Sequence, residues 1–200
     1  MTLKVHYVFS RKFELKCLLK ILFDPENRLQ WDTDCEQNEI IPLKEDVSCF
    51  GQIYSLKKKK FNFGIRDELS KFFGFMHAGT YYRYSSSVHD FDPNQPNVRI
   101  LSNEMAHKEA VRQENIYTCF KIYRSQKDSL IYMDCVSSLD TKTQVPKYLI
   151  NPFIHKQARE KYDNIVKFYV KNHGQVDKKA KSASKRHNST DQSFKMVDPN

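Results

Sequence analysis

Residues 151–169 read NPFIHKQAREKYDNIVKFY, and this stretch decides how the rest of the chain can fold. Asn151 is a good N-cap, and Pro152 suits the first helical position, where its missing N–H costs nothing. Apolar residues then recur at three- or four-residue spacing, at Ile154, Ala158, Tyr162, Ile165 and Tyr169. The pattern predicts one long amphipathic helix that needs an apolar surface to pack against.

Segments typical of strands precede this helix. The first, Leu3–Phe9, alternates apolar and polar residues. Ser10 can cap a helix that runs to about Phe23, and a short helix is expected over Glu26–Trp31. Further strands are predicted at Glu39–Ile41, Cys49–Leu56, Phe61–Phe73, Thr80–Val88, Val98–Ser102, Ile116–Tyr123 and Leu130–Ser137. Strands joined by short turns, with helices segregated from them, indicate an α+β domain.

Length and composition limit the class of protein. The chain has 200 residues, of which 40% are apolar and 13% aromatic, enough for one domain, expected over residues 1–174. Residues 175–200 are rich in Lys, Ser, Asn and Asp and are predicted to form a disordered basic tail. No apolar run approaches the ~18–20 residues of a membrane span, and the N-terminus lacks the apolar core of a signal peptide. Five cysteines without a C-x-x-C pair favour reduced thiols, so a cytoplasmic location is expected, with peripheral contact to membranes as an option.

Five short motifs, in this order along the chain, resemble the steroidogenic acute regulatory protein-related lipid-transfer (START) domain. They are Leu22–Asp32, Ile65–Asp67, Ser85–His89, Val98–Arg99 and Gln144–Asn151. The resemblance implies a helix-grip fold, in which a curved antiparallel sheet wraps around the long C-terminal helix. It also implies a tunnel that shields one lipid, lipid transfer without vesicles, and no catalysis. In the family a further helix and strand precede the segment that matches Leu3, so an N-terminally shortened domain is expected.

Arg66 is the first candidate for contact with a lipid, because the resemblance places the matching arginine in the tunnel. A guanidinium with five donors suits a polar lipid group in an apolar cavity. Alternation along the strand puts Arg66 on the face opposite Phe61 and Phe63. If those phenylalanines line the tunnel, Arg66 does so only if a bulge at Gly64 resets the alternation. The alternative is a surface arginine beside Asp67.

Four more residues complete the predicted lipid-contact set. Tyr82 and Tyr84 share one face of their strand, and aromatic hydroxyls suit a cavity that is apolar yet offers a few polar anchors. Ordinary sheet core is the alternative for these two tyrosines. Ile154 and Tyr162 belong to the set because they lie on the apolar stripe of the closing helix.

The consecutive lysines Lys57, Lys58, Lys59 and Lys60 fall between two predicted strands and are expected at a hairpin tip. A lysine near an anionic bilayer contributes about 1 kcal/mol to binding, so membrane contact is predicted for this run. A solvated turn is the alternative.

The sequence contains none of the spacings that mark catalytic triads, phosphate loops or metal ligands. No enzymatic activity, metal or cofactor is therefore expected. The predicted partner is a lipid, which could be a sterol, a phospholipid or a sphingolipid. Nucleic acid is not expected, because neither basic cluster is interleaved with aromatic residues. The alternative function is a ligand-free protein-interaction or membrane-surface attachment module with a basic tail.

Overall fold

A computed structural model describes residues 2–41, 50–58, 64–87, 108–140, 142 and 147–173, with the backbone alone at 50 and 147–153. Its elements are, in order, β1 (Thr2–Phe9), α1 (Leu15–Phe23), α2 (Pro25–Trp31), β2 (Cys35–Ile41), β3 (Phe50–Lys57), β4 (Arg66–His77), β5 (Thr80–Ser87), β6 (Val111–Arg112), β7 (Glu114–Arg124), β8 (Ile131–Asp140) and α4 (Lys147–His173). The α+β element order predicted from the sequence is confirmed. The predicted strand at Val98–Ser102 and the predicted tail lie outside the described residues.

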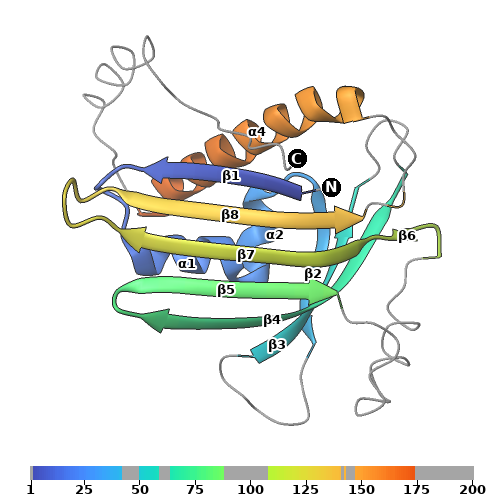
Figure 1. The fold of residues 1–200 in the computed structure, drawn as a ribbon, viewed down its shortest axis with the longest axis horizontal. Coiled ribbons are helices and arrows are strands. Elements are labelled where there is room, and N and C mark those ends of the chain that lie inside the picture. Colours follow the sequence, from blue (N-terminus) through green and yellow to red (C-terminus); the bar gives the residue numbers. More distant parts are fainter. Residues whose placement is uncertain are drawn as a thin grey trace.

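The strands form one sheet in the order β1-β8-β7-β5-β4-β3-β2, so β1 and β2 are its edges. All these pairs are antiparallel. The short β6 runs parallel to β4 and pairs with its first two residues, beyond Ser87, where β5 has ended. Figure 1 shows that α1, α2 and α4 lie on the same side of the sheet. We call the helix side the inner face and the opposite side the outer face.

The apolar core occupies the inner face at one end of the sheet, where β4 turns into β5 and β7 turns into β8. Strand register places Phe9 opposite Ile131, and Ile122 opposite Met133. These side chains pack against the apolar stripes of α1 and α4. The buried members of this core are Phe9, Phe13, Leu18, Ile21, Leu22, Trp31, Ile122, Ile131, Met133, Ile165 and Tyr169. At this end, the inner face is filled with side chains.

Helix α4 is attached to the rest of the domain by tyrosine hydroxyls. Tyr7 donates to the carbonyl of Ala158, and Tyr162 donates to the carbonyl of Val8, both at 2.9 Å. The hydroxyl of Tyr169 accepts from the backbone N–H of Glu14, also at 2.9 Å. All three bonds lie in the part of the helix from Ala158 onward, so that part is anchored to β1 and to the start of α1.

Two predicted helix starts are wrong. Helix α4 begins at Lys147, so Asn151 is inside the helix rather than its N-cap, because the residues before it continue the helix by one turn. Helix α1 begins at Leu15 with Glu14 as its N-cap, not at Ser10. Ser10 instead closes a tight turn, in which its carbonyl accepts from the N–H of Phe13 at 3.0 Å. That turn carries Phe13 into the core, which a helix starting at Ser10 would not do.

Candidate functional site

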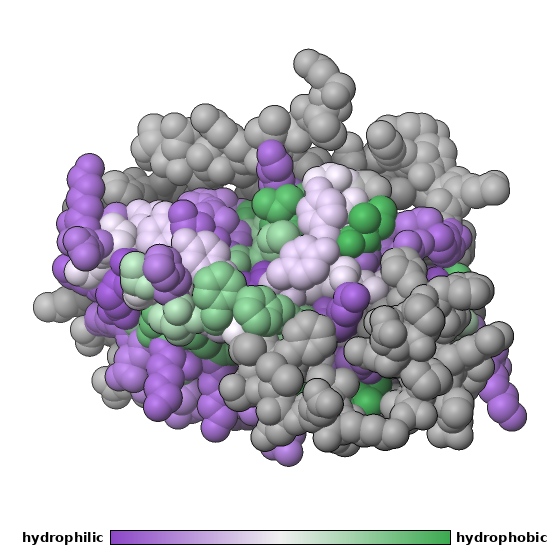
Figure 2. All heavy atoms as spheres, turned by 60° about the horizontal axis from the view of Figure 1, so that its bottom comes forward, coloured by the Kyte–Doolittle hydropathy of each residue, from purple (hydrophilic) through white to green (hydrophobic). Residues whose placement is uncertain are grey.

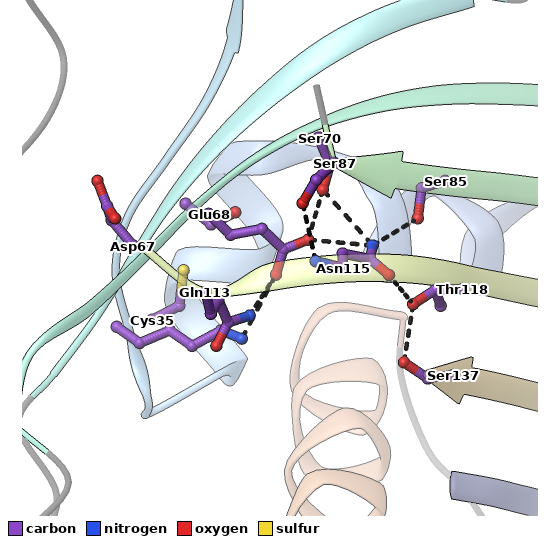
Figure 3. Close-up of polar contacts among 12 residues, drawn as sticks. Cys35, Asp67, Glu68, Ser70, Ser85, Ser87, Gln113, Asn115, Thr118 and Ser137 are labelled. Atoms are coloured by element: carbon purple, nitrogen blue, oxygen red, sulfur yellow. Dashed lines mark hydrogen bonds and ion pairs between the residues drawn. The ribbon is translucent and has the colours of Figure 1, made fainter. Parts of the chain in front are cut away.

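The inner face becomes polar at the opposite end of the sheet, where β4 begins. Side chains from four strands and the β6–β7 junction meet there, and Figure 3 shows most of them pointing toward one another. We call this set the polar cluster: Glu68, Ser70, Ser85, Ser87, Gln113, Asn115, Thr118 and Ser137. The arrangement follows from strand alternation, because Ser70 pairs with Ser87, Ser85 with Thr118, and Thr118 with Ser137.

Glu68 is the centre of the polar cluster. Its carboxylate accepts from the Ser70 hydroxyl and the Gln113 amide, each at 2.5 Å, and from the Asn115 amide at 3.2 Å. The network continues from Asn115 to Thr118 at 3.0 Å and from Thr118 to Ser137 at 2.8 Å. Buried polar groups need such partners, and these groups have them from β4 across to β8.

Charged side chains from α2, β3 and α4 adjoin the polar cluster. The ammonium of Lys57 lies 3.7 Å from the Glu68 carboxylate. Asp32, at the end of α2, lies 3.3 Å from Arg28 and 3.6 Å from Lys161 of α4. A charge-assisted hydrogen bond is usually 2.7–2.9 Å long, so these looser ion pairs leave donors able to bind another acceptor.

Burial and neighbouring positive charges together determine the pKa shifts of Glu68, Asp32 and Lys57. Burial alone would raise the pKa of Glu68, but Lys57 and the hydrogen bonds from Ser70 and Gln113 lower it. Burial would likewise raise the pKa of Asp32, and Lys161 and Arg28 lower it. The pKa of Lys57 is lowered, first by burial and then by repulsion from Lys161 and Arg28, and Glu68 only partly offsets this. The potential here favours an anionic or strongly accepting group.

The side chains of Glu68 and Lys57 remain partly accessible, at 17% and 28% exposed. Both nevertheless lie on the face that the helices cover, and burial shifts both pKa values. Groups in a solid core would not keep this accessibility. Water can therefore reach Lys57 and Glu68, whereas the members of the polar cluster behind them are buried: Ser70, Ser87, Gln113, Asn115 and Ser137.

Arg66 lies on the inner face, two residues before Glu68 on the same strand. Its guanidinium donates to the carbonyl of Ile65 at 3.3 Å. The face that Ile65 and Leu69 share points outward, where both pack in a small second apolar cluster. Asp67 also points away from Glu68 (Figure 3) and is bound through both oxygens to Arg112, at 2.8 and 2.9 Å. Arg66 is therefore not the partner of Asp67.

Tyr82 and Tyr84 lie on the outer face, opposite the helices. Tyr82 pairs in register with Phe75 and Lys121, and Tyr84 is 45% exposed. The expectation that they line a space beneath α4 does not hold, because the intervening residues of β5 point inward. One of these, Arg83, lies with its guanidinium carbon 3.9 Å from the Phe72 ring centre and 4.5 Å from that of Phe23.

The two predicted residues of α4 lie on its buried stripe. Tyr162 is half-buried, with ring centres 5.7 Å from Tyr7 and 5.3 Å from Phe9. Burial raises the pKa of Tyr162. Ile154 is half-buried one turn before Ala158.

The four consecutive lysines do not share one environment. Lys57 is the last residue of β3 and faces inward to Glu68, so it is not part of a solvated hairpin tip. Lys58 is exposed, and its backbone N–H donates to the carbonyl of Asp34 at 2.9 Å. Lys59 and Lys60 lie outside the described residues.

Sequence reasoning did not find Glu68, Gln113 or Asn115 as site residues. A signal was present, since polar residues recur on one face of β4, β5, β7 and β8 at positions where an ordinary core would have apolar ones. Within the described residues, no group of three or more His, Cys, Asp or Glu could hold a metal ion. No helix in that same part of the chain is long and apolar enough to cross a membrane.

Comparison with known proteins finds neighbours by structure alone. No family model matches the sequence, and no curated protein matches it. Human STARD10 has a TM-score of 0.68 at 18% identity, over 93% of this chain and 68% of that one. Human StAR-related lipid transfer protein 5 also has a TM-score of 0.68, at 13% identity, over 86% of this chain and 76% of its own. The lipid transfer and protein localization domain of human StarD13 has a TM-score of 0.64 at 14% identity, over 84% of this chain and 76% of its own. The predicted resemblance to START domains and the helix-grip fold are confirmed.

Proposed function

We propose that this protein binds a single lipid between the inner face of its sheet and helix α4, and moves it between membranes. The fold is shared with domains named for lipid transfer. The observation that carries the proposal is the polar cluster, with partly exposed Glu68 and Lys57 at its edge, beside an apolar core on the same inner face. Such a face offers an amphipathic guest both a polar and an apolar surface. No chemical reaction is part of the proposal.

The energetic demand on a lipid carrier explains why the guest must be enclosed. Each CH₂ removed from water contributes about 0.8 kcal/mol, so a lipid with ~30 chain carbons resists exposure by roughly 20 kcal/mol. Release therefore has to occur at a membrane. In the proposal, the first turns of α4 move to admit the lipid, while the part of α4 from Ala158 onward stays in place.

In the proposal, the polar headgroup of the lipid lies at the beginning of β4. The excess of positive charge around Lys57 suits a phosphate oxygen, and Glu68 with Asn115 offers partners for a hydroxyl or amide. Arg66, on the same face, is a second donor for the headgroup. A phospholipid or a phosphate-bearing sphingolipid therefore fits better than a sterol. Lys58 and the lysines after it follow the same end of β3 and would attract an anionic bilayer to it.

The test is native mass spectrometry of the protein purified without detergent. A bound mass that is a lipid supports the proposal, and extraction of headgroup-labelled phosphatidylcholine from vesicles supports transfer. The variant Lys57→Met should lose most of the bound phospholipid, whereas Lys127→Met, at an exposed turn lysine, should retain it. An empty protein that also extracts nothing from vesicles would overturn the proposal in favour of a ligand-free interaction module.

A second experiment tests the moving part. A disulfide engineered between the first turns of α4 and the sheet should stop lipid exchange and leave already bound lipid in place. Reduction of the disulfide should restore exchange. Exchange that continues at the same rate in the oxidised protein would remove α4 from the mechanism.

A further inference from the structure

Exposed apolar side chains gather on the β4–β5 hairpin, at the far end of the sheet from the polar cluster. The exposed fractions are 39% for Phe73, 44% for Phe75, 54% for Met76 and 45% for Tyr84. With Tyr82 we call these residues the hairpin patch. Figure 2 shows apolar and weakly polar side chains collected on this side of the molecule, with hydrophilic side chains around them. Single exposed apolar residues are ordinary, whereas a contiguous set marks an interaction surface.

The hairpin patch is preformed. The ring centres of Phe73 and Phe75 lie 5.4 Å apart, and Phe75 stacks on Tyr82 at 5.4 Å and 21°. The turn is tight, because Ala78 and Gly79 both have positive φ, 45° and 73°, as in the two-residue turns that match strand twist. The patch can therefore bind without first ordering its own side chains.

Both faces of the hairpin end carry exposed apolar residues. Phe75 is on the outer face and Met76 on the inner face, because successive strand residues point to opposite sides. All residues from Phe75 to Gly79 are exposed. A rigid protein partner would cover one face of such a ribbon. A fluid apolar medium surrounds both faces, so the geometry suits insertion into the interfacial layer of a bilayer.

The charged residues of the β4–β5 hairpin itself have one sign. The segment from Lys71 to Ser87 contains two lysine or arginine residues and a histidine, and no aspartate or glutamate. Lys121 of β7 lies opposite Tyr82 in register, with its ammonium 5.0 Å from the Tyr123 ring centre. Cations complement the anionic headgroups of a membrane surface. Apolar and tyrosine side chains beside them complement its acyl and interfacial regions.

We propose that the β4–β5 hairpin is a membrane-docking element for anionic bilayers. Phe75 and Met76 enter the acyl boundary, Tyr82 and Tyr84 lie at the level of the headgroups, and Lys71 contacts anionic lipid. Phe75 and Met76 lie seven and eight residues along β4 from Glu68, about 25 Å at strand spacing, so the end of the hairpin is well separated from the centre of the polar cluster. Docking by the hairpin does not require a bound lipid guest.

Two tryptophan reporters test the placement. The chain has one tryptophan, Trp31, which is 7% exposed and supplies a constant background. Phe75→Trp puts a reporter in the hairpin patch, and Ile116→Trp puts one on an exposed residue near the start of β7. Vesicles of brominated phosphatidylcholine with phosphatidylserine should quench the first reporter. Quenching of the Ile116→Trp reporter alone, or of neither reporter, would overturn the proposal. Quenching of both reporters would support a membrane contact at the hairpin together with a second membrane contact near Ile116.

Binding strength provides the second measurement. The double variant Phe75→Ser with Met76→Ser should lower cosedimentation with phosphatidylcholine–phosphatidylserine vesicles at least about tenfold, while Ile116→Ser should not change it. Lys71→Ala should weaken binding about fivefold at low salt and less at high salt. Circular dichroism of each variant checks folding.

Two other occupants of the hairpin patch are outcomes of the same experiments. If the double variant abolishes a concentration-dependent dimer in sedimentation velocity and no reporter is quenched, the patch binds a second copy and the membrane proposal is wrong. If a single-stranded oligonucleotide changes the fluorescence of the tryptophan reporters and vesicles do not, the membrane proposal is also wrong. The double variant should lose vesicle binding but keep its lipid content in native mass spectrometry. This result distinguishes membrane docking by the hairpin from lipid binding in the proposed function.

Discussion

Replacing Glu68 by glutamine tests whether the polar cluster depends on its one central charge. Glutamine keeps the size and one acceptor oxygen, but it removes the larger of the two attractions that Lys57 has, from Glu68 and Asp32, in a region where Lys161 and Arg28 repel it. At 3.7 Å, and at an effective dielectric constant of ~20, the attraction removed is about 4 kcal/mol. Desolvation of both charges offsets much of this, and both are partly exposed. We expect Glu68→Gln to lower the free energy of unfolding by about 2 kcal/mol.

Thermal and urea unfolding provide the assay for this substitution. In a domain of this size, about 2 kcal/mol corresponds to a fall in Tm of about 4–8 °C. Glu39→Gln is the matched control, because Glu39 is exposed on β2 and accepts a single side-chain hydrogen bond, from Gln37 at 2.8 Å. Equal destabilisation by the two substitutions would refute the role assigned to Glu68.

The effect of Glu68→Gln should also depend on pH. The folded-state pKa of Glu68 is lowered, so its charge contributes stability above the unfolded-state pKa and loses that contribution as pH falls through the folded-state pKa. The stability difference between the wild-type protein and the variant should therefore be full at neutral pH and shrink below about pH 4. A difference that grows on acidification would contradict the sign of this pKa shift.

Three further predictions address packing, hydrogen bonding and thiol chemistry. A Cβ atom at Gly51 would lie 2.5 Å from the Phe72 ring, so Gly51→Ala should lower the free energy of unfolding by about 1–3 kcal/mol, and an unchanged urea midpoint would disprove it. Trp31→Phe removes a buried bond of 2.7 Å from the indole N–H to the Ile21 carbonyl, and thermal unfolding should show a loss of about 1–3 kcal/mol. Burial raises the pKa of Cys135 to about 12, so this thiol should resist iodoacetamide in the folded protein and react after denaturation, with peptide mass mapping as the readout.

The spacing of apolar residues predicted the elements well, because each strand or helix of this domain has a regular apolar repeat. The stripe from Ile154 to Tyr169 marked the closing helix, and Ala158 and Ile165 are buried as that pattern requires. Cap residues were less informative. Asn151 and Ser10 both have the chemistry of an N-cap, but neighbouring residues and the burial of Phe13 decided where each helix begins.

The candidate site was harder to predict, because alternation says which residues share a face and not which face is inward. Tyr82 and Tyr84 were grouped correctly on one face, and that face is the outer one. Arg66 had to share the face of Glu68, but only the sheet's position against the helices shows that this face is inward. The polar cluster joins residues up to 69 positions apart in the chain, from Glu68 to Ser137, and no local pattern reports such a meeting.

The tyrosine bonds that attach α4 also set how that helix can swing. They lie from Ala158 onward, and Gln157 donates to the Asp34 carboxylate at 3.3 Å, so the turns from Lys147 to Lys156 form a lever arm of about 15 Å beyond this attachment. A bend of ~20° at Ala158 would carry the tip at Lys147 through about 5 Å, roughly the width of one acyl chain, while the part of the helix from Ala158 onward keeps its bonds to Val8 and Glu14. A small angular change at one end is then sufficient for a passage-sized displacement at the other.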